Sequence, residues 1–261
     1  MNFITIDDIN IPDLKIYHQF RDNAFTADNS FVADSPKVVN LLLEADITVR
    51  SILATQEYYD TYEHLIKDKD IPQLFVAGKA FMQEIVGHKI HHNVMMHGTR
   101  PAQTALEELD DHIIMLDEIS STQNIGSIAR SAAAIGVNSY LLPTHGPHPY
   151  SRRALRVSMG HISMLKYHQY NDIFSTLMTL KENGYTIFAA EVTEDSISLQ
   201  NVKISGKWVL LMGHEGSGIS QDILDVCDEV VSIEMAEGVK SFNVGVAASI
   251  MMYQLTHKVK K

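Results

Sequence analysis

Hydrophobic residues recur along this chain in short runs separated by helix-like patterns, and the alternation is clearest in the second half. Candidate strands are HIIMLDEI (112–119), NSYLLP (138–143), YTIFAAEV (185–192), KWVLLMG (207–213) and EVVSIEM (229–235). Helical patterns lie at 124–135, 151–159, 171–183, 219–227 and 243–257. Apolar strands that alternate with helices are typical of a mostly parallel sheet with helices on both faces. We therefore expect an α/β domain over residues 106–261.

The first hundred residues alternate in the same way over shorter elements. Residues 36–46 predict a helix behind Ser35, because Pro36 suits the first helical turn. The other predicted elements are a strand at 47–55, a helix near 56–67, a strand at 72–78 and a helix at 79–86. Residues 93–111 show no clear period and contain Gly98 and Pro101, which predicts a linker that ends near residue 106. We expect a smaller α/β domain with its linker over residues 1–105.

Composition restricts where the protein acts. The 261 residues are 45% hydrophobic, but no apolar run reaches the roughly 18 to 20 residues of a membrane span. Acidic residues stand in the first ten positions where a signal peptide would carry lysines. A single cysteine, Cys227, suits a reducing compartment and is interpreted as a buried structural thiol. These features favour a cytoplasmic protein.

A net charge of −11 argues at first against a nucleic-acid-binding protein. Net charge governs solubility and long-range steering, however, and a local basic patch can still bind phosphate groups. Arg152, Arg153 and Arg156 would lie close together on a helix and form the best such patch. Composition thus leaves RNA open as a partner.

Polar and glycine-rich residues gather in three loops that adjoin predicted strands, where α/β proteins bind ligands. In the first, at 120–136, Asn124 is a plausible helix cap and Arg130 follows six residues later inside the helix. The second, MGHEGSGIS (212–220), is neither a dinucleotide-binding nor a phosphate-binding glycine loop. Its glycines allow close backbone approach or positive φ, and Glu215 could act chemically or merely accept backbone N–H groups.

In the third loop, at 232–255, polar residues precede a helix of small residues, VGVAASI. Small side chains allow this helix to pack closely on another backbone. The final helix is apolar and almost free of charge, which implies deep burial, either within the subunit or at an interface.

Together the three loops resemble the motifs of the SpoU (TrmH-type) branch of the SPOUT RNA methyltransferases. The matching residues are Asn124, Gly126 and Arg130 in the first motif, Gly213, Glu215, Gly216 and Gly218 in the second, and Ile233, Met235, Ser241, Asn243 and Val244 in the third. The stretch YSRRALRVSMGHISML also resembles the family, so the match covers about residues 110–256. Thr122, Glu234 and Phe242 depart from the usual proline, proline and leucine. FVADSPKVVNLLLEA is similar, more loosely, to a ribosomal-protein-like substrate-binding domain, with Ala33-Asp34 in place of Glu-Gly.

The resemblance implies an S-adenosylmethionine-dependent 2′-O-methyltransferase acting on RNA, with rRNA favoured over tRNA, a knotted C-terminus and a homodimer with sites at the interface. It implies a cofactor site at Gly213, Ile233, Phe242, Met235, Gly218 and Ala190. Arg130 would be the central catalytic residue, grouped with Asn124, Ser241, Asn243 and Glu215. Because arginine keeps its proton at neutral pH, an electrostatic role for Arg130 is physically easier than a role as base.

Other functions fit the sequence less well. A non-catalytic RNA-binding module would not require the polar set of the three motifs, and a Rossmann oxidoreductase would require a dinucleotide loop. His88, His91, His92 and His97 lack cysteines and a regular ligand spacing, so no metal is expected. The SSTQ stretch has no ordered His/Asp partner of the kind that serine hydrolases need.

Overall fold

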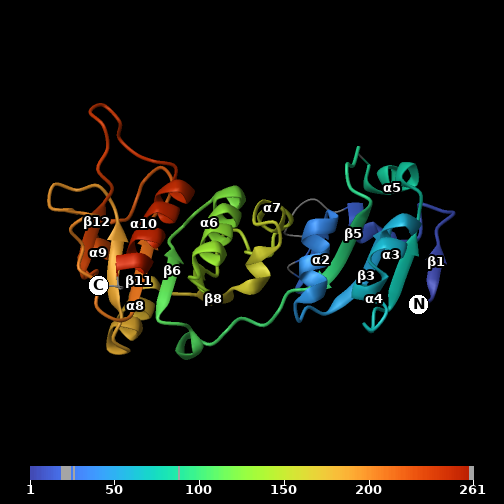
Figure 1. Cartoon of the computed structure of the whole chain (residues 1–261), viewed down its shortest axis with the longest axis horizontal. Helices are drawn as coiled ribbons and strands as arrows, with labels where there is room; N and C mark the ends of the chain where they lie inside the picture. The colour runs from blue at the N-terminus through green and yellow to red at the C-terminus, as the bar shows by residue number, and fades with distance from the viewer. Residues whose placement is uncertain (19–24, 26, 88, 259–261) are drawn as a thin grey trace. The chain divides into compact units, whose positions relative to one another are not determined.

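The computed structural model describes residues 1–18, 25, 27–87 and 89–258, and these form two compact units (Figure 1). The first unit comprises Met1–Ala102 and His148–Ser163, and the second comprises Gln103–Pro147 and Met164–Lys261. The first division falls near the expected boundary at residue 106. The segment 148–163, by contrast, packs with the N-terminal unit, although its place in the sequence indicated the larger domain. The two units are therefore linked by more than one crossing of the chain.

The N-terminal unit is built on a five-stranded mixed sheet. Its elements are β1 (Phe3–Thr5), η1 (Pro12–His18), β2 (Ser30–Asp34), α2 (Pro36–Glu44), β3 (Val49–Ala54), α3 (Gln56–Thr61), α4 (Glu63–Ile66), β4 (Gln73–Val76), α5 (Lys79–Val86), β5 (Val94–Thr99) and α7 (Arg152–Val157), with η3 (His161–Met164) at the edge of the unit. The strand order is β1-β4-β3-β5-β2, in which β5 is antiparallel to both of its neighbours. Helix α2 begins at Pro36, as the sequence predicted, and the Ser35 hydroxyl group caps it.

Strand β5 corrects the expectation of a linker over residues 93–111. It lies in the interior of the sheet, between β3 and β2, and Val94, Met95 and Met96 are all buried. A strand covered on both faces shows no alternation of polar and apolar residues, so its periodicity gave no signal. Gly98 has a packing role here, since a Cβ atom at this position would lie 2.8 Å from the ring of Phe31.

The second unit is a parallel seven-stranded sheet with helices, which confirms the predicted α/β class. Its elements are η2 (Leu106–Glu108), β6 (His112–Leu116), α6 (Thr122–Ile135), β7 (Ser139–Pro143), β8 (Lys166–Tyr170), α8 (Ile173–Glu182), β9 (Thr186–Ala190), β10 (Ile197–Ser198), β11 (Trp208–Met212), α9 (Gln221–Leu224), β12 (Glu229–Ser232) and α10 (Val244–Lys258). The strand order is β10-β12-β9-β11-β6-β7-β8, and every neighbouring pair is parallel. Only the two edge strands, β8 and β10, lacked a prediction. The knot implied by the family resemblance stays a prediction.

Helices of this unit bury apolar surface on its sheet. Leu177 of α8 and Ile223 of α9 lie in one buried cluster with Val209 of the central strand β11. Helices α6 and α10 pack against each other, and α10 also contacts β11. A Cβ atom on Gly245 of α10 would lie 2.5 Å from the hydroxyl oxygen of Ser127 in α6, so the small-residue helix packs closely, as predicted. Within the described part of the chain, no helix has the length and apolarity needed to span a membrane.

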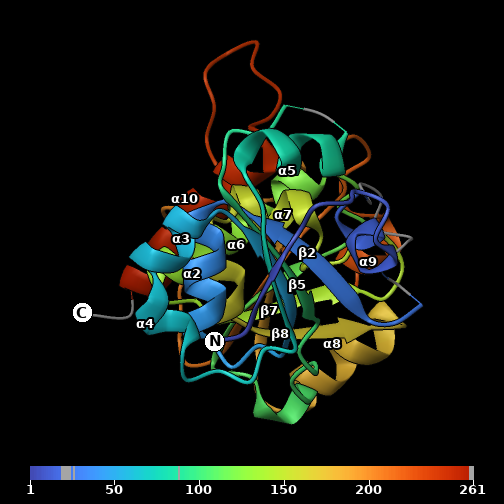
Figure 2. The ribbon, with the colours of Figure 1, turned by 90° about the vertical axis from the view of Figure 1, so that its right-hand side faces the viewer.

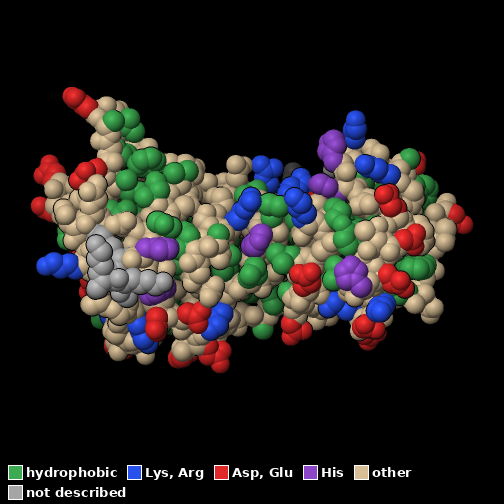
Figure 3. Space-filling view, in the orientation of Figure 1, with side chains coloured by type: hydrophobic (Ala, Val, Ile, Leu, Met, Phe, Trp, Pro, Cys, Tyr) green, Lys and Arg blue, Asp and Glu red, His purple; other side chains and the backbone are tan. Residues whose placement is uncertain are grey.

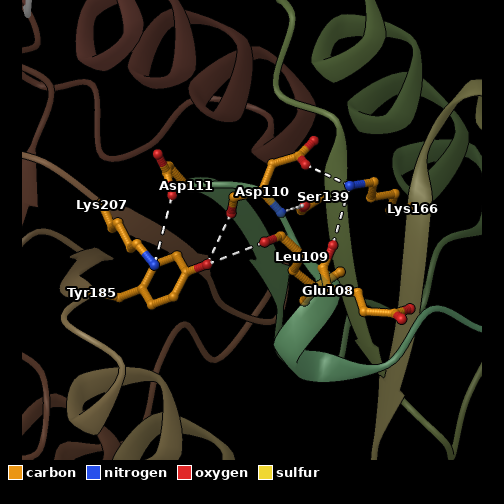
Figure 4. Close-up of polar contacts among 8 residues, drawn as sticks. All are labelled: Glu108, Leu109, Asp110, Asp111, Ser139, Lys166, Tyr185 and Lys207. Atoms are coloured by element: carbon orange, nitrogen blue, oxygen red, sulfur yellow. Dashed lines mark hydrogen bonds and ion pairs between the residues drawn. The ribbon is translucent and has the colours of Figure 1, made fainter.

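A polar network fixes the amino ends of these strands (Figure 4). Asp110 lies just before β6. Its backbone N–H donates to the Ser139 hydroxyl at 2.7 Å, and the Asp110 carboxylate accepts from Lys166 at 2.6 Å. The Tyr185 hydroxyl, at the start of β9, donates to the carbonyl oxygen of Asp110 at 3.0 Å. The segment before β6 is thus tied to the amino ends of three other strands, β7, β8 and β9. The loops at the carboxyl ends of the strands carry the polar motifs.

Candidate functional site

A cavity of about 550 Å³ lies at the carboxyl ends of β9, β11 and β12, beside the start of α10. The segment between β12 and α10 extends away from the sheet as a long loop (Figures 1 and 2). Ten of the eleven residues predicted for catalysis or cofactor binding line the cavity: Asn124, Ala190, Gly213, Glu215, Gly218, Ile233, Met235, Ser241, Phe242 and Asn243. The three loops therefore meet at one site, although they are widely separated in sequence.

The glycine-rich loop after β11 is folded tightly on itself. A Cβ atom on Gly213 would lie 2.7 Å from the carbonyl oxygen of Gly218, so no other residue fits there without a backbone shift. Gly218 has a φ of +68°, and a Cβ atom on it would lie 2.1 Å from a carboxylate oxygen of Glu191. The ring nitrogen Nδ1 of His214 accepts from the backbone N–H groups of Gly216 and Ser217 at 3.0 and 3.2 Å. The predicted positive φ is present at Gly218, whereas the close approach at Gly213 is to the protein's own backbone and not to a ligand.

Glu215 joins this loop to the start of α6. Its carboxylate accepts from the backbone N–H groups of Ser120 and Ser121 at 3.2 and 3.1 Å, and from the side-chain amide of Asn124 at 2.9 Å. Partial burial acts to raise the pKa of Glu215, but these hydrogen bonds outweigh it and lower the pKa to about 2. Glu215 is therefore a carboxylate at neutral pH, and it accepts backbone N–H groups, one of the two roles left open by the sequence.

Asn124 continues the connection to the third loop. Its side-chain oxygen accepts from the amide of Asn243 at 3.2 Å, and the Asn243 oxygen accepts from the backbone N–H groups of Gly245 and Val246 at the start of α10. The expectation that Asn124 caps α6 is wrong, because Ser121 is the cap and Asn124 lies in the first turn. A chain of hydrogen bonds through Glu215, Asn124 and Asn243 thus connects all three loops.

Arg130 is the predicted catalytic residue that does not line the cavity. Six residues of helix separate it from Asn124, which corresponds to about 9 Å along the axis and about 240° around it. Its side chain is exposed and has no hydrogen-bond or ion-pair partner among the described residues. Arg130 thus lies outside the cavity of its own chain, and its catalytic role stays a prediction.

Glu191 is a cavity residue that was not predicted. It follows β9 directly, and its carboxylate accepts from the backbone N–H of Ile219 at 2.9 Å. Its position at the carboxyl end of a predicted strand was the available signal, but no motif marked it. Glu191 places a second carboxylate in the cavity and braces the glycine loop.

The three arginines predicted to bind RNA lie on α7, in the N-terminal unit. Arg152 and Arg156 both pair with the buried carboxylate of Asp34 in β2, at 2.7 and 2.6 Å. Their guanidinium groups hold the pKa of Asp34 below its usual value, although burial acts in the opposite direction. Arg153 is exposed and lies between them in sequence. The sequence did not reveal that Arg152 and Arg156 share Asp34 as a structural partner.

The remaining predicted features lie outside this cavity. The described residues contain no group of three or more His, Cys, Asp or Glu side chains placed to hold a metal ion, and His88 lies outside those residues. Cys227 is half-buried, and burial raises the pKa of its thiol to about 11. A thiol that stays protonated at neutral pH is a poor nucleophile, in agreement with a structural role.

Comparison with known proteins identifies the class to which this fold and site belong. The model of the SpoU rRNA Methylase family matches residues 111–253, a range that contains every matching residue of the three motifs. The chain therefore belongs to the SpoU family of RNA methyltransferases. It is 27% identical over 235 residues to an uncharacterised tRNA/rRNA methyltransferase of Mycobacterium tuberculosis, covering 86% of this chain and 80% of that protein.

Solved structures share the fold over almost the full length. An AdoMet-bound rRNA methyltransferase from Sinorhizobium meliloti has a TM-score of 0.87 at 18% identity, covering 99% of both chains. A structure described as an RNA 2′-O ribose methyltransferase has a TM-score of 0.78 at 18% identity, again covering 99% of both chains. At such low identity these likenesses show a common fold for both units.

Proposed function

We propose that this chain transfers a methyl group from S-adenosyl-L-methionine to a ribose 2′-hydroxyl of structured RNA. The observation that carries the proposal is the convergence of three motif loops on one cavity, with Glu215, Asn124 and Asn243 joined in a continuous hydrogen-bond chain. Membership in the SpoU family and the fold shared with a 2′-O ribose methyltransferase support this reaction.

The cavity fits S-adenosyl-L-methionine in size and in charge. Its volume of about 550 Å³ lies in the usual range of roughly 300–1,000 Å³ for small-molecule sites. Backbone groups at Gly213, Ile233 and Phe242 would hold the cofactor, with Met235, Gly218 and Ala190 beside them. The carboxylates of Glu191 and Glu215 favour a cationic ligand. When bound, the cofactor supplies a methyl group on a positively charged sulfur.

The protein must position a hydroxyl group that is a poor nucleophile at neutral pH. Asn124 and Asn243 are engaged with Glu215 and the N-terminus of α10, so they fix the geometry of the loops. Ser241 lines the cavity without a hydrogen-bond partner in the described part of the chain, which leaves its hydroxyl group available to a ribose. Arg130 keeps its charge and would stabilise the developing alkoxide or hold an RNA phosphate.

A homodimer is part of this proposal. Three large side chains on α10 are exposed: Val246, Ile250 and Tyr253, at 47%, 39% and 58%. The spacing of four and three residues puts them on one face of the helix. The opposite face, with Ala248 and Met252, is fully buried within the chain. A second copy of the chain packed on the exposed face would bury these side chains, as the apolar final helix implied. In such a dimer, Arg130 would act in the cavity of the other copy.

Ribosomal RNA is the proposed substrate in preference to tRNA, because a separate N-terminal unit adds a second RNA-binding surface to the catalytic one. The test is a map of ribose methylation on total RNA from cells with and without this protein. Loss of a methyl group at one rRNA position is the expected result. Loss from a tRNA would support the alternative substrate.

The competing function is an RNA-binding module without catalysis. Calorimetric titration with S-adenosyl-L-methionine, with NADH as a control ligand, separates the two. Metal-independent binding of the first and none of the second is expected. A chain that binds RNA but not S-adenosyl-L-methionine would be such a module.

A further inference from the structure

A second, smaller cavity lies within the N-terminal unit, apart from the motif loops. It has a volume of about 200 Å³ and lies beside β2, β5 and α7. Six of its lining residues carry ionisable side chains: Asp34, Lys89, His91, His92, Arg152 and Arg156. It shares no lining residue with the cavity proposed to bind S-adenosyl-L-methionine.

Positive charge dominates this cavity. Lys89, Arg152 and Arg156 face a single carboxylate, that of Asp34, so the net charge of the lining is +2 with both histidines neutral. Lys89 has no ion-pair or hydrogen-bond partner within the described residues. Figure 3 shows Lys, Arg and His side chains gathered along the upper margin of the N-terminal unit. Such an excess is unusual in a chain whose net charge is −11, and it attracts an anion.

Asp34 fixes both arginines and leaves one hydrogen-bond donor of Arg156 unused. Arg156 donates to the carboxylate through Nε at 3.0 Å and Nη2 at 2.6 Å, which leaves Nη1 without a protein acceptor in the described structure. Arg152 donates to the same carboxylate through Nε at 2.8 Å, and its side chain is only 12% exposed. A carboxylate that is 5% exposed holds both guanidinium groups in place, which is the preorganisation that a phosphate-binding arginine needs.

The positive charges also act on His92. Burial lowers the pKa of His92, and the neighbouring Arg156, His91 and Lys79 lower it further, against the effect of Asp34. A neutral imidazole can donate one hydrogen bond, and a phosphate group nearby would favour the doubly donating cation. The cavity therefore offers donors from lysine, arginine and histidine, and its single carboxylate is already engaged by the two arginines.

We infer that this cavity binds a backbone phosphate of the RNA substrate, through Lys89, Arg156 and the two histidines, and so anchors RNA on the N-terminal unit. The inference rests on the proposed function, because it takes RNA as the source of the phosphate. Guanidinium and ammonium groups are the side chains that neutralise RNA phosphates. Asp34 is what brings the two arginines together here.

The test is RNA binding by matched charge variants. Lys89→Gln removes a charge that no contact in the described chain requires, and Lys69→Gln makes the same change at an exposed position outside the cavity. The probe is a fluorescent RNA hairpin of about 20 nucleotides, and anisotropy is measured over a range of salt concentrations. Lys89→Gln should weaken binding several-fold and reduce the slope of log K against log salt by about 0.7–0.9, as expected for one lost phosphate contact. Lys69→Gln should match the wild type in both.

Two further measurements separate loss of a phosphate contact from a disturbed fold and from binding of free anions. Arg156→Gln should act like Lys89→Gln on binding, and thermal unfolding shows whether loss of its contact with Asp34 disturbs the fold. Inorganic phosphate, added at constant ionic strength, should compete with the hairpin for wild-type protein but not for Lys89→Gln. Equal slopes for Lys89→Gln and Lys69→Gln would overturn the inference while leaving the methyltransferase proposal intact. Binding of inorganic phosphate without any effect on RNA would also overturn it, by identifying a site for free anions. Failure of the wild type to bind any RNA would defeat both proposals.

Discussion

An alanine at position 218 should damage the cofactor cavity, whereas an alanine at position 216, in the same loop, should be tolerated. Gly218 has a φ of +68°, a conformation that costs an L-residue about 1–2 kcal/mol. The added Cβ atom would also lie 2.1 Å from a carboxylate oxygen of Glu191, and moving this flexible side chain away breaks its hydrogen bond with the backbone N–H of Ile219, which costs about 1–2 kcal/mol. At Gly216 the nearest atom is 3.5 Å away, which is an ordinary contact.

The unfolding of this unit can be followed selectively, because Trp208 is the only tryptophan and is fully buried in its sheet. Denaturant titration by tryptophan fluorescence should show Gly218→Ala less stable than the wild type by about 2–4 kcal/mol, with Gly216→Ala within about 1 kcal/mol. Calorimetry should show about tenfold weaker binding of S-adenosyl-L-methionine to Gly218→Ala, because the loop must move away from Glu191.

The double variant with Glu191→Ala tests the cause. Removing the carboxylate relieves the overlap but not the positive φ, so the double variant should be more stable than the sum of the single effects predicts. If Gly218→Ala and Gly216→Ala are equally stable and bind the cofactor equally well, then Gly218 does not have the positive φ and the close contact with Glu191 that this prediction requires.

Three further results are expected. Arg130→Ala should abolish single-turnover methylation of RNA while leaving the calorimetric affinity for S-adenosyl-L-methionine nearly unchanged, because Arg130 lies outside the cofactor cavity; methylation at the wild-type rate would remove Arg130 from the mechanism. Glu215 has a pKa of about 2, below its ordinary 4.5, so its contribution to stability is present above about pH 4.5 and is lost as the pH falls towards 2. Glu215→Gln should flatten that part of the stability profile, measured by Trp208 fluorescence, and an unchanged profile would contradict the hydrogen bonds described. Ile250→Glu on the exposed face of α10 should convert a dimer into a monomer by light scattering at micromolar concentration, and a monomeric wild type would exclude the proposed dimer.

The sequence predicted the second unit well because its central strands are apolar along their whole length. A run such as Val209 to Met212 is buried on both faces of a parallel sheet, and glycine or polar residues mark the loop that follows. The positions of the loops at the carboxyl ends of strands then placed the site residues near one another. Strand β8, KYHQY, gave no such signal, because an edge strand tolerates polar residues.

Contacts between residues distant in sequence could not be predicted in this way. Asp34 and Arg152 are 118 positions apart, and neither residue indicates that the other will neutralise it. The segment 148–163 was therefore placed with the wrong neighbours, since its helical pattern shows an apolar face but not the surface that the face covers. The position of Arg130 relative to the cavity could not be predicted either. Its spacing from Asn124 gives the angle between the two side chains around the helix, but not the place of the cavity.

Thr122 and Phe242, which depart from the family motifs, take no part in the hydrogen bonds that join the three loops. Thr122 is the first residue of α6, directly after the cap Ser121, and a proline there would do no more than preset a φ angle that the helix already has. Phe242 lines the cavity and is 41% exposed, so it offers a flat apolar surface where the family has a leucine. The hydrogen bonds that join the loops are made by Glu215, Asn124 and Asn243, none of which departs from the motifs. It follows that restoring the family residues at positions 122 and 242 should alter cofactor affinity more than loop geometry, because only Phe242 contacts the space where the cofactor is proposed to bind.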